Sequence, residues 1–298
     1  CIRDSPDVEH PENQYLSDFL SDRAVDFISH SAESEVPFFL YYADFLVHKP
    51  FEAKERYLEQ FATKPPAAHQ KSPMAAAMIK SLDDSVGKIL HALDQHKLSR
   101  NTLVVFTSDN GGLSYEEDGI RENNTSNLPL RGRKGSEYEV GIRVPWILRW
   151  PDQAPRGVDC DVPVHHIDLY PTFAAAADQE RDASPPQTLH GTDLLPLFRD
   201  PTGKKTDRKL FWYLPGYSSF HTPSVMVREG DWKLIRRLET SEHLLINTAT
   251  DIGESSDQSK EYPEIAKRLN RSAMDWLDAM NAPRMTPNPE FDPTAQAR

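Results

Sequence analysis

Two adjacent side chains with oxygen donors, Asp109 and Asn110, begin the sequence Asp-Asn-Gly-Gly directly after an apolar run. Carboxylate and amide oxygens are hard ligands suited to Ca²⁺ or Mg²⁺, and two glycines let the backbone turn tightly beneath a bound ion. An Asx turn that closes a strand would give the same pattern, and for this motif alone it is the more common outcome. The pair is therefore a candidate metal site, to be weighed with its neighbours in the chain.

Two further polar features lie on either side of that pair. Downstream, Arg131, Arg133 and Lys134 place three cations within four residues between glycines, an arrangement that can hold the oxygens of a tetrahedral anion. Upstream, His48 precedes a Lys-Pro pair, and an imidazole can donate a proton or a hydrogen bond to an anionic oxygen. Taken alone, a solvated basic loop and a structural histidine are the commoner outcomes. Together, the three features indicate one hard cation and one tetrahedral anion held side by side.

The spacing of apolar residues predicts the elements that position these features. Residues 15–29 and 74–96 have apolar residues three or four apart, which is typical of amphipathic helices. Residues 38–43 and 103–106 are short continuous apolar runs, which are typical of buried strands. This alternation favours an α/β fold with a mostly parallel sheet and helices on both of its faces. Ligands bind such sheets beyond the carboxyl ends of the strands, where the histidine and the Asp-Asn pair fall.

The pattern changes after about residue 205. Before that point, residues 144–150 predict another strand and residues 166–177 another helix. Beyond it, we expect three strands and a closing helix, at residues 224–229, 232–238, 242–248 and 265–280. A Gly-Asp turn between the first two strands favours an antiparallel hairpin. The sequence thus predicts an α/β domain at residues 1–204 and a small α+β antiparallel subdomain at residues 205–298.

Composition narrows the classes of function. The formal charge of −12, from 46 acidic and 34 basic residues, argues against nucleic acid as a partner, because long-range attraction to phosphate is missing. Hydrophobic residues make up 38% of the chain, which is enough for a sizeable core. The two cysteines, Cys1 and Cys160, give neither a disulfide framework nor a metal-binding spacing. No apolar stretch follows Cys1, so we expect neither a signal peptide nor a membrane anchor in the given sequence.

In their order along the chain, these motifs resemble the formylglycine-dependent, arylsulfatase-type sulfatases of the alkaline phosphatase superfamily. The resemblance runs from Tyr15 to about Asp292. The matching segments are residues 37–41, 48–50, 82–87 and 101–112, the loop around Lys134, and residues 167–172, 230–235 and 287–289. So many ordered matches make coincidence negligible.

The resemblance implies an alkaline-phosphatase-like fold, in which residues 1–204 form the C-terminal portion of the catalytic domain. It implies that Asp109 and Asn110 are ligands of one Ca²⁺, that Lys134 contacts the sulfate, and that His48 contacts the sulfate or its leaving oxygen. It also implies a sulfuric ester hydrolase acting on a sulfated small molecule or a sulfated glycan, exported to the periplasm or out of the cell. One departure is Val140, which stands where the family usually has glycine; a β-branched residue resists positive φ, so the loop could be shaped differently.

The family's nucleophile is a cysteine oxidised to formylglycine within a Cys-x-Pro-Ser-Arg motif, and its hydrate attacks sulfur. Neither Cys1, followed by Ile-Arg-Asp-Ser, nor Cys160, followed by Asp-Val-Pro, fits that motif. We therefore expect the chain to be the C-terminal part of a sulfatase whose nucleophile lies upstream, and the fragment alone to be inactive. Substrate contacts are expected from residues 113–128 and 212–223.

Two other interpretations remain open at this stage. One is a phosphodiesterase or phosphatase of the same superfamily, whose two transition-type metals need imidazole ligands. Asn110, where such enzymes commonly have histidine, supplies oxygen instead and favours the sulfatase. The other is a non-catalytic relic that binds sulfated ligands, an interpretation that the missing nucleophile motif supports.

Overall fold

The structure is a computed structural model that describes residues 10–113, 125–177, 188–203, 208–218, 221–286 and 288–289. Most of the predicted loop at residues 113–128 and the Pro-Pro pair at residues 185–186 lie outside the described residues. The helices are α1 (Leu16–Glu33), α2 (Glu55–Ala62), α3 (Pro73–Gln95), α4 (Glu139–Ile142), α5 (Leu169–Ala176), α6 (Leu195–Arg199) and α7 (Pro263–Ala279), with 3-10 turns η1 (Ser99–Asn101) and η2 (His166–Asp168). The strands are β1 (Val104–Thr107), β2 (Trp146–Arg149), β3 (Lys209–Leu214), β4 (Ser224–Glu229), β5 (Trp232–Arg237) and β6 (His243–Asn247).

The two long helices α1 and α3 confirm the predicted helices and pack along each other through small polar residues. Ser17 and Ser21 of α1 and Ser81 and Ser85 of α3 are all buried, and small side chains let two helix backbones approach closely. The Ser85 hydroxyl donates to the backbone oxygen of Ser17 at 3.4 Å. At the start of α3, Ser72 accepts a hydrogen bond from the Ala75 amide at 3.1 Å, a normal N-cap.

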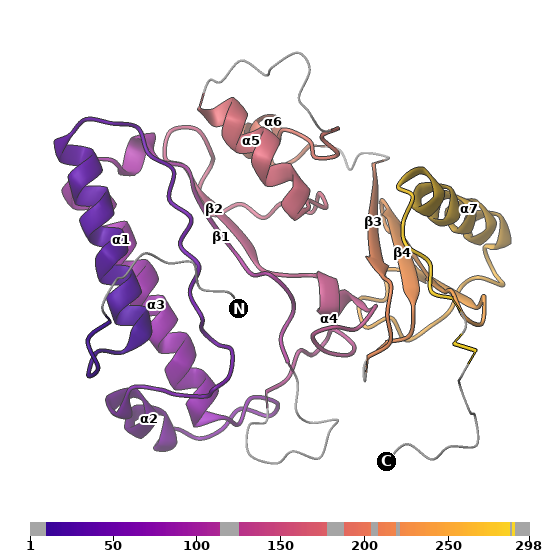
Figure 1. Cartoon of the computed structure of the whole chain (residues 1–298), viewed down its shortest axis with the longest axis horizontal. Coiled ribbons are helices and arrows are strands. Elements are labelled where there is room, and N and C mark those ends of the chain that lie inside the picture. Colours follow the sequence, from indigo (N-terminus) through magenta and orange to yellow (C-terminus); the bar gives the residue numbers. More distant parts are fainter. Residues whose placement is uncertain are drawn as a thin grey trace.

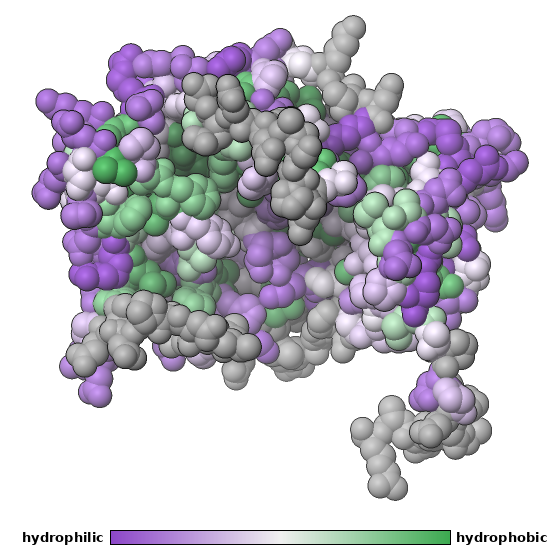
Figure 2. All heavy atoms as spheres, turned by 45° about the horizontal axis from the view of Figure 1, so that its top comes forward, coloured by the Kyte–Doolittle hydropathy of each residue, from purple (hydrophilic) through white to green (hydrophobic). Residues whose placement is uncertain are grey.

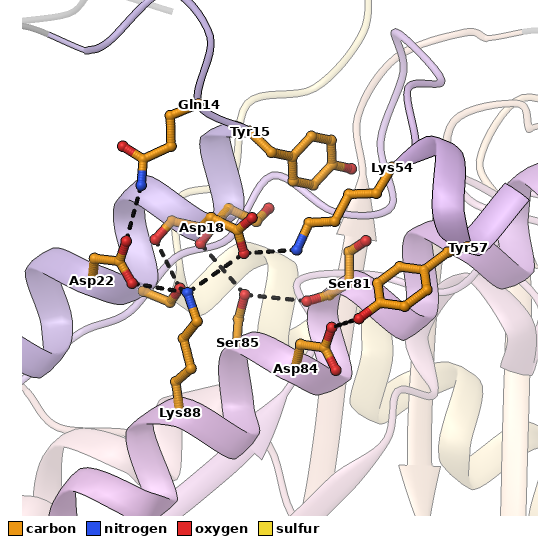
Figure 3. Close-up of polar contacts among 12 residues, drawn as sticks. Gln14, Tyr15, Asp18, Asp22, Lys54, Tyr57, Ser81, Asp84, Ser85 and Lys88 are labelled. Atoms are coloured by element: carbon orange, nitrogen blue, oxygen red, sulfur yellow. Dashed lines mark hydrogen bonds and ion pairs between the residues drawn. The ribbon is translucent and has the colours of Figure 1, made fainter.

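Ion pairs surround this helix interface (Figure 3). Lys88 of α3 reaches Asp22 of α1 at 2.8 Å, and Lys54 reaches Asp18 at 2.7 Å. The aspartates at positions 83 and 84 both pair with the lysine one turn earlier in α3, at 2.9 and 2.6 Å. These contacts give the Asp-Asp pair an ion-pairing role within α3, where the lysine neutralises its charge.

Strands β1 and β2 lie between two helical layers (Figure 1). On one face, Val104 packs against Ile28 of α1 and Leu93 of α3. On the other face, the Thr107 hydroxyl lies 3.4 Å from the His166 ring of η2. The α/β layering with helices on both faces is thus confirmed.

We expected a mostly parallel sheet, and β1 and β2 are an antiparallel pair within the described residues, with Phe106 opposite Ile147. Parallel neighbours need a crossover connection, which is usually a helix. The described part of the connection between β1 and β2 holds only the one-turn helix α4.

The predicted strand at residues 38–43 runs without a strand ladder in the described part of the chain. Its side chains nevertheless alternate as in a strand. Phe38 and Leu40 pack on the α1–α3 core, whereas Phe39 faces Phe173 of α5 at 5.7 Å between ring centroids. The continuous apolar run therefore corresponds to an extended segment with apolar contacts on both of its faces, but a strand also needs a hydrogen-bonded neighbour, which the pattern cannot report.

The C-terminal part is a four-stranded antiparallel sheet in the order β3-β4-β5-β6, covered by α7. The predicted hairpin is present as β4 and β5, joined by Gly230, whose φ of +56° suits a residue without a side chain. Leucines from β5, β6 and α7 are fully buried together: Leu234, Leu245, Leu269 and Leu277. The first strand of the sheet, β3, was not predicted.

Asp168 ties η2 to the strand that opens this sheet. Its carboxylate accepts from the His165 and Thr192 amides, both at 2.8 Å. It also binds the Arg208 guanidinium through two hydrogen bonds of 2.6 and 2.9 Å, the bidentate geometry that makes such pairs strong. Among the described helices, none is both long and apolar enough to cross a membrane.

Candidate metal and anion site

The Asp-Asn pair lies in the turn that follows β1, beyond the carboxyl end of that strand. Asp109 is exposed, and Asn110 is half-buried. The Ser108 hydroxyl donates to the Asn110 backbone oxygen at 3.0 Å, and the Asn110 side-chain nitrogen donates to the Gly111 oxygen at 3.1 Å. Asn110 uses its side-chain nitrogen in this contact. Its side-chain oxygen, which is the atom that a hard cation would bind, takes no part in it.

This turn is in backbone contact with the loop that carries Lys134. The Lys134 amide donates to the Gly112 oxygen at 2.9 Å, and the Asn127 side chain donates to the same oxygen at 2.9 Å. A Cβ added to Gly111 would lie 1.4 Å from the Val140 oxygen, so only glycine fits there. The structure therefore brings Asp109, Asn110 and Lys134 into two adjoining loops.

Glycines shape the Lys134 loop. Gly132 and Gly135 have φ values of +86° and +82°, which place them in the left-handed region that favours glycine. Val140 needs no such conformation, because it lies inside the one-turn helix α4 and its side chain is buried. The valine that departs from the family pattern is thus accommodated by ordinary helical backbone, and the expected distortion at this position is not found.

A buried ionic cluster joins this loop to the C-terminal sheet. Glu139, the first residue of α4, lies 3.2 Å from the ammonium of Lys233 of β5 and 3.3 Å from the guanidinium of Arg228 of β4. The same lysine lies 2.8 Å from Glu254, whose other oxygen accepts from the Glu139 amide. Lys233, Glu139 and Glu254 have almost no exposed surface. Arg131 donates to the Glu254 backbone oxygen at 3.0 Å, which adds a second link.

The two carboxylates of the cluster differ in proton affinity. For Glu139, burial alone would raise the pKa, but the charges of Lys233 and Arg228 lower it below its usual range. Burial raises the pKa of Glu254, an effect that Lys233 counters only in part. One lysine cannot balance two buried carboxylates, so the carboxylate that also has an arginine stays ionised more readily.

The sequence interpretation did not identify Glu139, Lys233 or Glu254 as site residues. One signal was available for Lys233, because it stands in the apolar run Trp-Lys-Leu-Ile of a predicted strand. A lysine that alternation places inside a sheet core needs a buried partner. Nothing in the sequence indicates which carboxylates would supply it, because Glu139 and Glu254 come from distant loops.

His48 remains a prediction as a site residue. It is exposed, its Nδ1 lies 2.9 Å from the Lys49 oxygen, and its amide donates to the Phe45 oxygen at 2.9 Å. Within the described residues, no hydrogen bond or ion pair joins it to Asp109, Asn110 or Lys134.

Two histidines and two tryptophans form a cluster at the end of β1. His166 lies beside Trp146 and His165, with ring centroids 6.1 Å away in each case. The His165 ring faces Trp212 of β3 at 5.3 Å. Burial, and then the neighbouring His166, lowers the pKa of His165 and favours its neutral ring. The cluster links the end of β1 to the C-terminal sheet. The position of Trp212 is accounted for by this packing, and substrate contact by residues 212–223 stays a prediction.

The donor set fits a hard cation but does not complete its coordination. Asp109 and Asn110 supply carboxylate and amide oxygens, the types that Ca²⁺ prefers, whereas Ca²⁺ takes six to eight oxygens. Across the described residues, no group of three or more His, Cys, Asp or Glu side chains is placed to hold a metal ion. Further oxygens would have to come from other groups.

Comparisons with known proteins identify the family and the fold. The sulfatase family model matches residues 2–179, and the model of the N-sulphoglucosamine sulphohydrolase C-terminal region matches residues 133–277. A sulfatase of Formosa agariphila is 31% identical over 295 residues, covering 91% of this chain and 51% of that protein. Human arylsulfatase A is 33% identical over 210 residues, covering 70% of this chain and 38% of that protein.

Among solved structures, Ps i-CgsB in complex with k-i-k-neocarrahexaose matches 90% of this chain and 56% of that one, with a TM-score of 0.77 and 32% identity. The chain thus spans about half the length of the relatives it matches. Both the Asp-Asn turn and the Lys134 loop fall inside the matched regions.

Proposed function

Because this chain belongs to the sulfatase family, we propose that the protein containing it is a sulfuric ester hydrolase. The observation that carries the proposal is the backbone contact between the Asp-Asn turn and the Lys134 loop. Since the Lys134 amide bonds directly to Gly112, a cation at the turn and an anion at the lysine would be neighbours. A sulfate ester is an anion of the required tetrahedral shape.

In this proposal, the oxygens of Asp109 and Asn110 hold one Ca²⁺. The ion would neutralise negative charge on the sulfate oxygens. Lys134 contributes a second positive charge from the loop that adjoins the Asp-Asn turn. A preorganised cation of this kind typically contributes about 3 kcal/mol to transition-state stabilisation. His48 would contact the sulfate or its leaving oxygen, a role that rests on the resemblance alone.

The proposal includes a formylglycine nucleophile supplied from outside these 298 residues, because neither cysteine of the chain lies in the required motif. The 298-residue chain alone would then bind anions without turning over a sulfate ester. Export to the periplasm or the cell exterior is also part of the proposal, by analogy with the family.

For the substrate, we propose a sulfated glycan. The solved structure at 32% identity holds k-i-k-neocarrahexaose, which supports a saccharide over a small aryl ester. Sulfated oligosaccharides of different backbones, assayed in parallel with an aryl sulfate, would rank these classes by kcat/KM.

The test is turnover by the full-length protein that contains this chain, with 4-nitrophenyl sulfate and sulfated oligosaccharides as substrates. Lys134→Ala should lower kcat/KM by about 100-fold or more. The matched control is Lys267→Ala, which removes the same charge from an exposed position on α7 and should leave turnover unchanged. Calcium removal should abolish turnover, and added Ca²⁺ should restore it.

Four outcomes would overturn the proposal or one part of it. Faster turnover of 4-nitrophenyl phosphate or of a phosphodiester would favour a phosphatase or phosphodiesterase. Full activity in the presence of a calcium chelator would remove the metal assignment. Turnover by the isolated 298-residue chain would show that the nucleophile lies within it. If the full-length protein turned over no ester, the interpretation as a non-catalytic relic that binds sulfated ligands would be favoured.

A further inference from the structure

A histidine of the C-terminal sheet contacts the Lys134 loop next to the lysine itself. The Nδ1 atom of His221, in the connection between β3 and β4, lies 2.6 Å from the Gly135 oxygen. Ser218 holds this histidine in place, because its hydroxyl lies 2.8 Å from Nδ1 and accepts from the His221 amide at 3.2 Å. The Ser218 amide donates to the His221 oxygen at 3.0 Å.

The chemistry of this contact determines which nitrogen of the His221 ring carries a hydrogen. A carbonyl oxygen only accepts, so Nδ1 of His221 must carry the hydrogen. Neutral imidazole with its hydrogen on Nδ1 can donate this bond, and so can imidazolium. The contact to Gly135 therefore persists whether or not His221 binds a second proton.

Two hydrogen bonds thus hold the backbone on both sides of the Lys134 side chain. Before it, the Lys134 amide donates to Gly112 of the Asp-Asn turn at 2.9 Å. After it, the carbonyl of Gly135 accepts from His221. Gly135 has a φ of +82°, and glycine has the widest choice of backbone conformations. The Gly135 carbonyl belongs to the same peptide unit as the Ser136 amide, which donates to the Arg133 oxygen at 3.0 Å. Without the bond from His221, this unit is held only from the Arg133 side, so the turn that follows Lys134 has more freedom to change the direction of the lysine.

The geometry points to His221 as a positioning residue that orients Lys134 through the Gly135 carbonyl. It acts on the backbone of the loop and is assigned no contact with the substrate. The inference deepens the proposed function and rests on it for its effect on turnover. Its effect on the loop itself does not depend on that function and can be measured separately.

The first test measures amide hydrogen exchange in the 298-residue chain, at the Lys134 and Ser136 amides. These amides are bonded to the Gly112 and Arg133 oxygens. His221→Ala removes the donor to Gly135 and should speed exchange at both amides. His221→Asn places a side-chain amide nitrogen near the position of Nδ1 and should restore slow exchange. His69→Ala, at an exposed histidine, is the matched control and should change nothing.

The second test measures kcat/KM of the same variants in the full-length protein. A misdirected lysine should lower kcat/KM by about tenfold in His221→Ala, whereas His221→Asn should stay within about threefold of the parent protein and keep the shape of its pH profile. Rescue by asparagine separates positioning from a general loss of structure, which thermal unfolding of all three variants would report.

The two tests distinguish the failure of each idea. If the parent protein turns over no sulfate ester but exchange follows the predicted order, the proposed function fails and the positioning role stands. If exchange and kcat/KM are the same in His221→Ala and the parent protein, the positioning role is wrong. If asparagine is as impaired as alanine in both measurements, the ring acts by some means other than donation to Gly135, and the inference also fails.

Discussion

The two ends of the chain differ in how completely they bury their apolar residues. In the C-terminal sheet, Leu234 and Leu277 have no exposed surface and pack within a continuous core under α7. Near the N-terminus, Phe39 and Tyr41 are 69% and 81% exposed. Figure 2 shows a broad hydrophobic area over the N-terminal half at the left, whereas hydrophobic residues are more scattered over the C-terminal part at the right.

This difference shows which part supports the candidate site. The Asp-Asn turn extends from β1, in the layer with exposed aromatic side chains. The Lys134 loop, by contrast, is attached to the sheet with the complete core, through Lys233 and Glu254. The candidate site therefore depends on a contact between two parts of the chain. One is the C-terminal sheet, which has a fully buried core, and the other is the layer around β1, which has exposed apolar side chains. Three measurements of stability can test that account.

The largest effect should follow from Lys233→Met, which removes the charge that the buried Glu139 and Glu254 share. Loss of one partner from a buried ion pair typically costs about 3–5 kcal/mol in the free energy of unfolding. The measurement is urea-induced unfolding of the 298-residue chain. The matched control is Lys209→Met at the partly exposed pair with Glu229, which should cost about 0–1 kcal/mol. Equal costs for the two variants would show that the buried cluster does not hold the sheet and loop together.

A smaller effect is expected from truncation of the buried leucine in α7. Leu277→Ala leaves a cavity beneath the sheet and should lower the free energy of unfolding by about 2–5 kcal/mol. Tyr41→Ala removes a larger side chain from an exposed position and should change stability by about 0.5 kcal/mol or less. Both are read from the same denaturation curves. A cost for Tyr41→Ala that matches that of Leu277→Ala would mean that the exposed aromatic residues are buried in solution.

The smallest effect is a pH dependence that Glu254 introduces. Because its pKa is raised, the folded state binds this proton more tightly than the unfolded state, so the contribution of Glu254 to stability falls as pH rises above the ordinary pKa of 4.5. Glu139 has the opposite sign, since its lowered pKa gives stability that is lost as pH falls below that range. Relative to Glu254→Gln, the parent chain should therefore lose stability as pH rises above 4.5. Parallel curves over that range, from unfolding at a series of pH values, would contradict the assignment.

Much of the fold follows from local patterns in the sequence. Apolar spacing identified α1, α3, β1 and α7, and the Gly-Asp turn identified the β4–β5 hairpin. The short helices α2, α4 and α6 were not predicted, since few turns leave little periodicity to detect. The antiparallel direction of the β1–β2 pair was not predicted, because strand direction depends on the connection between strands and not on the strands themselves.

The candidate site was predictable only in part. Residue type and order indicated Asp109, Asn110 and Lys134, because each is chemically suited to an ion and each lies within two positions of a glycine that permits a tight turn. Their neighbours in space were hidden from the sequence. His221 and Glu254 lie 86 and 115 positions from their loop partners Gly135 and Glu139, and no local pattern reports a contact over such a separation.

Gly111 gives the site a fixed spacing that single mutations could alter. Its α-carbon carries only hydrogen where the other loop's carbonyl passes, so even one added methyl group would force the two loops apart. An alanine at this position would act as a molecular spacer, widening the separation between the Asp-Asn turn and Lys134 without removing a side chain of either. The spacing of the two loops of the candidate site is thus set at a residue that has no side chain to take part.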